Sequence, residues 1–215
     1  MKKLPRNFYN RPTLKVAIDL LGCHIISRTD GVKTGGMIVE TEAYIGQTDP
    51  ACHASNGLTE RNKVMHGSPG ILYVYFTYGN HFMMNVVTEK DGYPAAVLLR
   101  GLEPLYGVKE MAVRRGVSDP GNIASGPGKL AKALGAARAQ NGTNLSGSEI
   151  YIRGPFDGRR IIMASPRIGI GEPGSERLWR FFLKDNLHVS RPARSVRERT
   201  KSLSWARKIS FSLPE

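Results

Sequence analysis

Two β-rich runs on either side of a short turn constrain the fold of this chain more than any other sequence feature. The runs cover residues 71–78 and 81–87, and Gly79-Asn80 separates them. β-Branched and aromatic residues favour strands, and a glycine-containing pair between two such runs is typical of a tight hairpin turn. The sequence therefore predicts an antiparallel β-hairpin with Tyr78 beside its turn.

Shorter runs predict further strands and a few helices in mixed order. Alternating or apolar runs bounded by glycine and proline predict strands at residues 23–28, 37–44, 95–100, 149–153, 161–164 and 167–170. Apolar residues at helical spacing predict helices at residues 13–21, 107–115 and 128–139. The polar, turn-rich segment 46–70 is expected to be an irregular loop, and loops of this length are often functional.

The domain organisation is expected to be simple. The chain has 215 residues, and no Ser/Gly/Pro-rich linker divides it, so we predict one domain over residues 1–190. Residues 191–215 are expected to form a basic C-terminal extension, because residues 191–208 hold seven Lys or Arg and only one acidic residue, Glu198.

The compartment is expected to be the cytoplasm. The longest apolar run, residues 71–76, is too short to cross a bilayer, and Pro5 follows the basic N-terminus where the apolar part of a signal peptide would begin. The two cysteines, Cys23 and Cys52, suit a reducing compartment. Cys52-His53 is at most half of a zinc site, so no metal is expected.

The charge of the chain narrows the class of partner. Thirty-one Lys and Arg against eighteen Asp and Glu give a formal net charge of +13, a field that attracts polyanions. Nucleic acid is the leading partner. A ribosome-associated protein or an unrelated basic enzyme could have the same charge, so the choice depends on the chemistry of particular residues.

A pair of carboxylates stands out in the strand predicted at residues 37–44. Glu40 and Glu42 are two positions apart and share one face of that strand. Tyr44 and the loop follow at once. The pair indicates either the edge of an active site or a solvated strand face with incidental glutamates, and this segment alone leaves both interpretations open.

Together with His53, the hairpin tyrosines, Asn85 and Arg100, these carboxylates make the sequence resemble a known family. It is similar to the alkyladenine DNA glycosylases, also called 3-methyladenine DNA glycosylases of the methylpurine type. The matching motifs run in order from about residue 8 to about residue 190: residues 39–44, His53, Arg61-Asn62, residues 72–75, Tyr78-Gly79, Met84-Asn85, residues 98–100, 103–105 and 125–127, Lys129-Leu130, and residues 167–171.

The resemblance implies a fold and an activity. The fold is an α+β single mixed domain with a curved antiparallel β-sheet, surrounding helices and a protruding β-hairpin, similar to the C-terminal domain of a formyltransferase. The activity is that of a monofunctional DNA glycosylase in base excision repair. Such an enzyme flips alkylated or deaminated purines out of duplex DNA and hydrolyses the N-glycosidic bond. It acts without a cofactor, as a monomer, on double-stranded DNA, and is nucleoid-associated when bound.

The resemblance also implies roles for the reaction centre. Glu42 is the general base that activates water, and Arg100 and the backbone carbonyl of Ile168 help to hold that water. Breaking the bond builds positive charge on the sugar, which a carboxylate stabilises while it takes a proton from water. Arg100 could instead be a structural ion-pair partner of Glu40 or Glu103.

Further roles concern binding. The implied walls of the base pocket are Tyr44, His53 and Tyr75, and Asn85 screens the purine edge. Three of these four have a plainer alternative. His53 could anchor the loop, Asn85 could satisfy backbone groups, and Tyr75, like the other hairpin tyrosines and Tyr73 above all, could be a packing residue.

Two more implied roles concern the DNA itself. Tyr78 fills the gap left in the duplex, and Lys129 contacts a phosphate, unless it is only a solvated helix charge. No lysine occupies the matched pocket positions, which indicates hydrolysis without strand cleavage through a Schiff base. A non-catalytic nucleic-acid-binding module and an RNA-directed hydrolase of the same fold are the alternatives, and the preferred lesion is left open.

Overall fold

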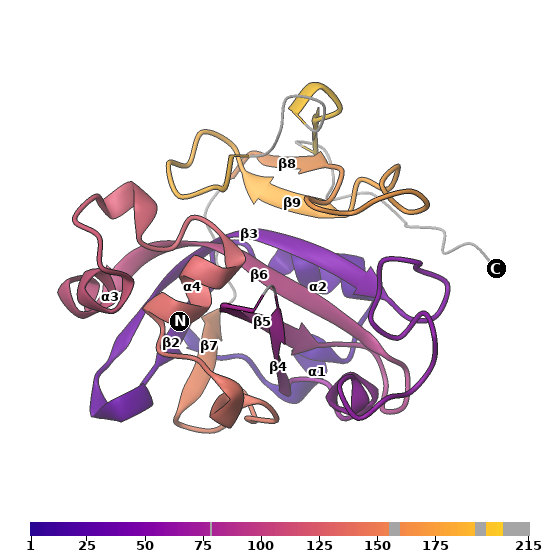
Figure 1. Cartoon of the computed structure of the whole chain (residues 1–215), viewed down its shortest axis with the longest axis horizontal. Coiled ribbons are helices and arrows are strands. Elements are labelled where there is room, and N and C mark those ends of the chain that lie inside the picture. Colours follow the sequence, from indigo (N-terminus) through magenta and orange to yellow (C-terminus); the bar gives the residue numbers. More distant parts are fainter. Residues whose placement is uncertain (78, 155–159, 192–196, 204–215) are drawn as a thin grey trace.

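The predicted hairpin is present and forms one edge of a large antiparallel sheet (Figure 1). Strand β4 (Leu72–Thr77) pairs with β5 (His81–Val87), with Tyr73 opposite Asn85. Strand β5 pairs with the next strand, β6 (Ala95–Tyr106), only through residues 85–87. The half of the hairpin nearest its turn therefore projects past the sheet.

The structure is a computed structural model of the chain that describes residues 1–77, 79–154, 160–191 and 197–203. Tyr78 lies outside the described residues, and so does the role predicted for it. No helix in these ranges is long and apolar enough to span a membrane.

Strand β3 (Thr34–Ile45) is the centre of the sheet. It pairs along its length with β6, and its other edge is shared by β2 (His24–Ser27) and β9 (Arg180–Leu183). Strand β9 also pairs with the antiparallel strand β8 (Ile162–Ser165), and the two lie together above β3 in Figure 1. The remaining strands are β7 (Ile150–Gly154) on β2, β1 (Lys2–Lys3) on β7, and β10 (Lys201–Ser202) on β8.

A few short helices cover the sheet. Helix α2 (Thr13–Asp19) packs on β3 and β6, and α4 (Pro127–Ala133) packs on β5 and β6. Apolar residues of both helices join the buried sheet residues in one hydrophobic core. The other helices are α1 (Arg6–Tyr9) and α3 (Val108–Arg115), with single 3-10 turns at Thr29–Gly31, Lys63–His66, Pro120–Asn122 and Arg138–Gln140. The predicted α+β class with an antiparallel sheet and a protruding hairpin is confirmed.

Some predicted elements were wrong or misplaced. The strand predicted at residues 167–170 is a turn around Ile168-Gly169. The strand that follows this turn and pairs with β3 is β9, for which no prediction was made. The third helix ends at Ala133 instead of residue 139, because Gly135 adopts a left-handed conformation with φ of +70° that terminates the helix. Part of the basic segment beyond residue 190 is joined to the sheet as β10.

The outer edge of β4 is covered by a neighbouring segment. The amide of Leu72 donates to the carbonyl of Thr143 (2.8 Å), and its carbonyl accepts from Gly142. Two residues further on, the amide of Val74 donates to the side-chain oxygen of Asn141 (2.9 Å). The edge strand that carries Tyr73 and Tyr75 is therefore held on both sides.

Candidate active site

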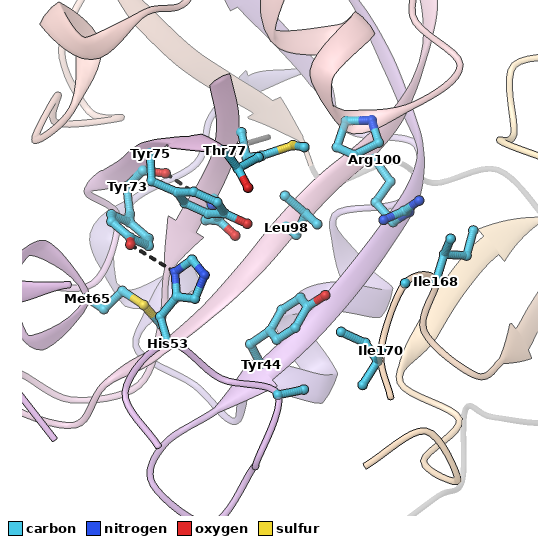
Figure 2. A pocket seen from close by; sticks show the side chains of 15 residues that line it. Tyr44, His53, Met65, Tyr73, Tyr75, Thr77, Leu98, Arg100, Ile168 and Ile170 are labelled. Atoms are coloured by element: carbon cyan, nitrogen blue, oxygen red, sulfur yellow. Dashed lines mark hydrogen bonds between the residues drawn. The ribbon is translucent and has the colours of Figure 1, made fainter. Parts of the chain in front are cut away.

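A cavity of about 320 Å³ opens between the hairpin, β3, β6 and the turn at Ile168-Gly169. Six of the residues predicted for the site line it: Tyr44, His53, Tyr75, Asn85, Arg100 and Ile168. Figure 2 shows Tyr44 and Arg100 on one side and His53, Tyr73 and Tyr75 on the other. Residues far apart in the chain thus form a single pocket with aromatic walls.

Glu42 lies directly behind the wall of this cavity. Its side chain is fully buried, and Oε1 accepts a hydrogen bond from the amide of Ile168 (2.7 Å). Oε2 accepts from the hydroxyl of Tyr44 (2.8 Å) and from Nη1 of Arg100 (3.2 Å). All three donors line the cavity. Ile168 thus touches Glu42 through its N–H, whereas the role implied for its carbonyl stays a prediction.

Glu40 differs from Glu42 in which residues surround it. Oε1 of Glu40 accepts from Nε of Arg100 (3.2 Å), Nε of Arg180 (2.6 Å) and the hydroxyl of Ser190 (2.7 Å), and Oε2 accepts from the amide of Ser190 (2.7 Å). A carboxylate oxygen has about two acceptor positions, so Oε1 of Glu40 is fully occupied, and of its donors only Arg100 lines the cavity. Glu42 accepts three bonds within the described residues and keeps one position on Oε1. All three donors to Glu42 line the cavity, whereas Arg180 and Ser190, which bond Glu40, do not.

The interpretation of the two glutamates as a solvated strand face is wrong, since both are fully buried. Burial alone would raise the pKa of Glu40, but the guanidinium groups of Arg100 and Arg180 and the bonds from Ser190 hold it below its ordinary value. Arg100 is indeed an ion-pair partner of Glu40, as the plainer alternative had it, and it pairs with Glu42 as well.

Behind Tyr44 lies a buried ion pair. Arg167 donates from Nη1 and Nη2 to the two carboxylate oxygens of Asp49 (2.6 and 2.7 Å), and Nη1 also bonds the carbonyl of Ala43 (2.9 Å). Its Cζ lies 4.7 Å from the centroid of the Tyr44 ring. Burial and the charge of Glu42 raise the pKa of Tyr44 well above its ordinary value, so its hydroxyl stays protonated and donates to Glu42.

The opposite wall consists of three stacked or crossed rings. Nδ1 of His53 and the hydroxyl of Tyr73 are 3.0 Å apart, and the rings of His53 and Tyr75 meet edge to face at 4.4 Å. Burial and the charge of Arg61 lower the pKa of His53 to about 4, so the imidazole is neutral at pH 7. When Nδ1 accepts from Tyr73, Nε2 carries the hydrogen and is a donor for a ligand.

Asn85 closes the cavity on the hairpin side. Its side chain is buried, lines the cavity, and donates from Nδ2 to the carbonyl of Tyr73 (3.2 Å). It therefore satisfies a backbone group, as the plainer alternative proposed, while it also faces the space where a ligand would lie. The bond fixes the orientation of the amide.

Lys129 is the described candidate that the structure does not bring to the cavity. It lies in the first turn of α4, where its Nζ bonds the side chain of Asn122. Its neighbour Pro127 does line the cavity. Lys129 therefore lies on the helix that borders the cavity but does not line it.

Cys52-His53 was the one place in the sequence where a metal could be suspected. Cys23 and Cys52 are both buried and form no disulfide, and burial raises the pKa of Cys52 to about 11. Among the described residues, no group of three His, Cys, Asp or Glu side chains is placed to hold a metal ion.

Several residues that build the site were not predicted from the sequence. Tyr73 was treated as a packing residue, yet it lines the cavity and contacts His53. Arg61 lies with its Cζ 5.2 Å from the Tyr75 ring, and the Arg61-Asn62 motif could have pointed to it. No local sequence pattern indicates the pairing of Arg167 with Asp49, because the two residues are 118 positions apart.

The chain was also compared with known proteins. Residues 7–187 match the family described as "Methylpurine-DNA glycosylase (MPG)". A protein of Methanocella arvoryzae is 49% identical over 199 residues, which cover 90% of this chain and 98% of that protein. A protein of Chlorobaculum tepidum is 44% identical over 207 residues, which cover 94% of this chain and 99% of that protein. Both bear the name "Putative 3-methyladenine DNA glycosylase".

The match spans most of the chain and includes the strands, the loop and the turn that surround the cavity. The protein is accordingly a DNA glycosylase, a hydrolase that acts on N-glycosyl bonds. Its fold, its carboxylate-backed aromatic cavity and its relatives together place the chain in the methylpurine-DNA glycosylase family.

Proposed function

We propose that the enzyme flips alkylated or deaminated purines out of duplex DNA into the cavity and hydrolyses the bond between base and sugar. The observation that carries this proposal is the place of Glu42, a buried carboxylate immediately behind an aromatic cavity with one acceptor position left. Inside a duplex the glycosidic bond is closed to water, so the nucleotide has to leave the stack before water can attack.

The cavity suits a flat base. Extrusion costs a few kcal/mol, and stacking on aromatic side chains returns roughly 1–3 kcal/mol per base. A purine between Tyr44 and Tyr75 would gain this stacking, with the neutral His53 at its edge as a hydrogen-bond donor. Guanidinium groups already lie near both tyrosine rings, that of Arg167 at 4.7 Å and that of Arg61 at 5.2 Å. We therefore expect neutral lesions such as hypoxanthine to bind in this pocket nearly as well as cationic ones.

The chemistry follows from the position of the carboxylate. As the glycosidic bond breaks, positive charge grows on the sugar, and Glu42 stabilises it while taking a proton from the attacking water. Arg100 bonds Glu42 through Nη1 and faces the cavity, where its remaining N–H groups can orient the water. The described residues that line the cavity include no lysine, which supports hydrolysis without a Schiff base and an intact abasic strand as product.

The direct test is incubation with alkylated duplex DNA, with analysis of the released bases and of abasic sites. We expect free modified purines and an equal number of abasic sites, with no strand breaks before alkali treatment. Double-stranded RNA with the same lesions is the control for the alternative substrate. If no modified base is released from DNA, the proposal is wrong.

Replacement of Asn85 by alanine is expected to raise activity on guanine-type bases relative to adenine-type ones. Guanine carries a 2-amino group on the edge that adenine and hypoxanthine leave bare, and Asn85 occupies space at the wall of the cavity. An unfavourable contact with that group is worth about 1–3 kcal/mol. The ratio of single-turnover rates on 7-methylguanine and hypoxanthine should rise by about tenfold to a hundredfold or somewhat more.

The matched control for this variant is Asn141→Ala. Asn141 bonds the same strand of the hairpin, through the amide of Val74, but does not line the cavity. Its replacement should leave the ratio unchanged. An unchanged ratio in a folded Asn85→Ala enzyme would mean that the residue only satisfies the carbonyl of Tyr73.

Lys129 is expected to contribute to the salt dependence of DNA binding. The net charge is +13, and each neutralised phosphate adds about 0.9 to the slope of log K against log salt concentration. Lys129→Gln should lower the slope on undamaged duplex by about 0.9, whereas Lys90→Gln, in the turn after β5, should leave it unchanged. Equal slopes for wild type and Lys129→Gln would show that the lysine is only a solvated helix charge.

A further inference from the structure

A buried ionic network lies behind the cavity, on the side of Arg100 away from Glu42. At its centre is Glu40, which is fully buried and accepts hydrogen bonds from Arg100, Arg180 and Ser190. Arg180 is fixed in turn by Ser165 (2.9 Å from its Nη1) and by the carbonyl of Ser190 (3.1 Å from its Nη2). Neither Glu40 nor Ser190 lines the cavity.

Arg100 is the link between this network and the site. Its Nε bonds Glu40 and its Nη1 bonds Glu42, each at 3.2 Å. Because the guanidinium is planar and rigid, two anchors on different nitrogens fix both its position and its rotation. Its other N–H groups are thereby aimed in a set direction, and Arg100 faces the cavity.

We propose that Glu40, Arg180 and Ser190 are positioning residues that act on the reaction through Arg100. The inference rests on the function proposed above. Glu40 does not line the cavity, and neither do its partners Arg180 and Ser190, so its contact with the site runs through Arg100. A contribution to stability does not explain why these residues are charged, because apolar residues of similar volume stabilise a protein interior as well as a buried ion pair does, or better.

Charge balance explains why the arrangement needs Arg180. The two carboxylates of Glu40 and Glu42 face the two guanidinium groups of Arg100 and Arg180, so the buried group is neutral as a whole. Without Glu40, Arg100 would be attracted to Glu42 alone and would be free to rotate about that bond. Glu40 thus holds Arg100 in place while Arg180 compensates the second negative charge.

The network also connects the site to the C-terminal part of the chain, through Arg180 and Ser190. Arg180 is the first residue of β9, and Ser190 lies beyond residues 7–187, which match the family. Ser190 directly precedes the basic segment that begins at Arg191. The backbone and hydroxyl of Ser190 bond the same carboxylate, so the start of the basic segment is attached to the partner of Arg100.

The test is a double-mutant cycle on single-turnover excision, with Glu40→Gln, Arg100→Gln and the double variant. Glu40→Gln should slow excision about 10- to 100-fold, the usual cost of losing an outer partner of a catalytic group or of an error of about 1 Å in its position, with affinity for lesion DNA unchanged. In the Arg100→Gln background the same change should cost nothing further. The control is Glu103→Gln, a partly buried glutamate that bonds Asn186 and should excise at the wild-type rate.

The outcomes separate this inference from the function itself. Wild-type enzyme without base release would refute the proposed function. An active wild type with Glu40→Gln at the same rate, or with equal losses in both backgrounds, would refute the inference alone. If Glu40→Gln does not fold, Ser190→Ala removes only the hydroxyl bond to Glu40 and should show a smaller loss that likewise vanishes with Arg100→Gln. A wild-type rate for Ser190→Ala would then overturn the inference.

Discussion

Glu42→Gln is expected to bind lesion-containing duplex DNA as the wild type does and to release the base about 10²–10⁴-fold more slowly, the usual weight of a positioned general base. The glutamine has nearly the same shape and can still accept from the amide of Ile168, which bonds the carboxylate at 2.7 Å. What it lacks is the negative charge and the capacity to take a proton. Single-turnover excision on duplexes with hypoxanthine, together with titration of binding, measures the two effects separately.

The buried setting of Glu42 makes the control important. Arg100 keeps Glu40 as a partner in this variant, so the fold should survive, and thermal unfolding checks this. Glu103→Gln removes a glutamate charge outside the cavity and should excise at the wild-type rate. Near-normal excision by folded Glu42→Gln would contradict the assignment of the base and would move that role to Glu40 or to another residue.

Asp49→Asn is expected to lower the free energy of unfolding by about 3–5 kcal/mol, because it leaves the charge of Arg167 buried without its counterion. Both side chains of this pair are fully buried, and the carboxylate binds both Nη atoms of the arginine. Domains of this kind are stable by only about 5–15 kcal/mol, so the change removes a large share. Urea unfolding of the variant and the wild type measures the difference.

A second aspartate ion pair of this chain is the matched control. Asp91 pairs with Arg6 at 2.8 Å, but both side chains are more than half exposed, and an exposed pair contributes about 0–1 kcal/mol. Asp91→Asn should therefore change the unfolding free energy little. A loss below about 1 kcal/mol for Asp49→Asn would place this pair with the surface pairs, and would mean that the hydrogen bond from Arg167 to the carbonyl of Ala43 suffices to hold the guanidinium.

Local signals explain which elements could be predicted from the sequence. The hairpin strands were predicted to within a residue, because strand propensity and the turn at Gly79-Asn80 act over neighbouring residues. The segment 167–170 has similar alternation but forms a turn, since Arg167 is buried against Asp49 and the next amide bonds Glu42. Strand β9 pairs with the part of the β3 edge that lies beyond the end of β2. No local sequence pattern indicates that this part of the edge is open to a further strand.

The candidate site divides in the same way. Residues of the hairpin and of β3 could be selected because their spacing and the family motifs are visible in the sequence, and they do line or back one cavity. The residues that hold these side chains in place could not be recognised from the sequence. Arg180 and Ser190 lie 140 and 150 positions from Glu40 in the sequence. At such a separation, the sequence does not indicate which carboxylate a guanidinium or a hydroxyl will bond.

The covered edge of β4 has a consequence for how the protein behaves in a crowded solution. An open edge strand of this composition, rich in tyrosine and valine, is a template for strand addition by other chains and for aggregation. Here Thr143, Gly142 and the side chain of Asn141 occupy the amide and carbonyl of Leu72 and the amide of Val74. The chain can therefore keep an aromatic strand at the border of its sheet while the first half of that border is closed to a second molecule.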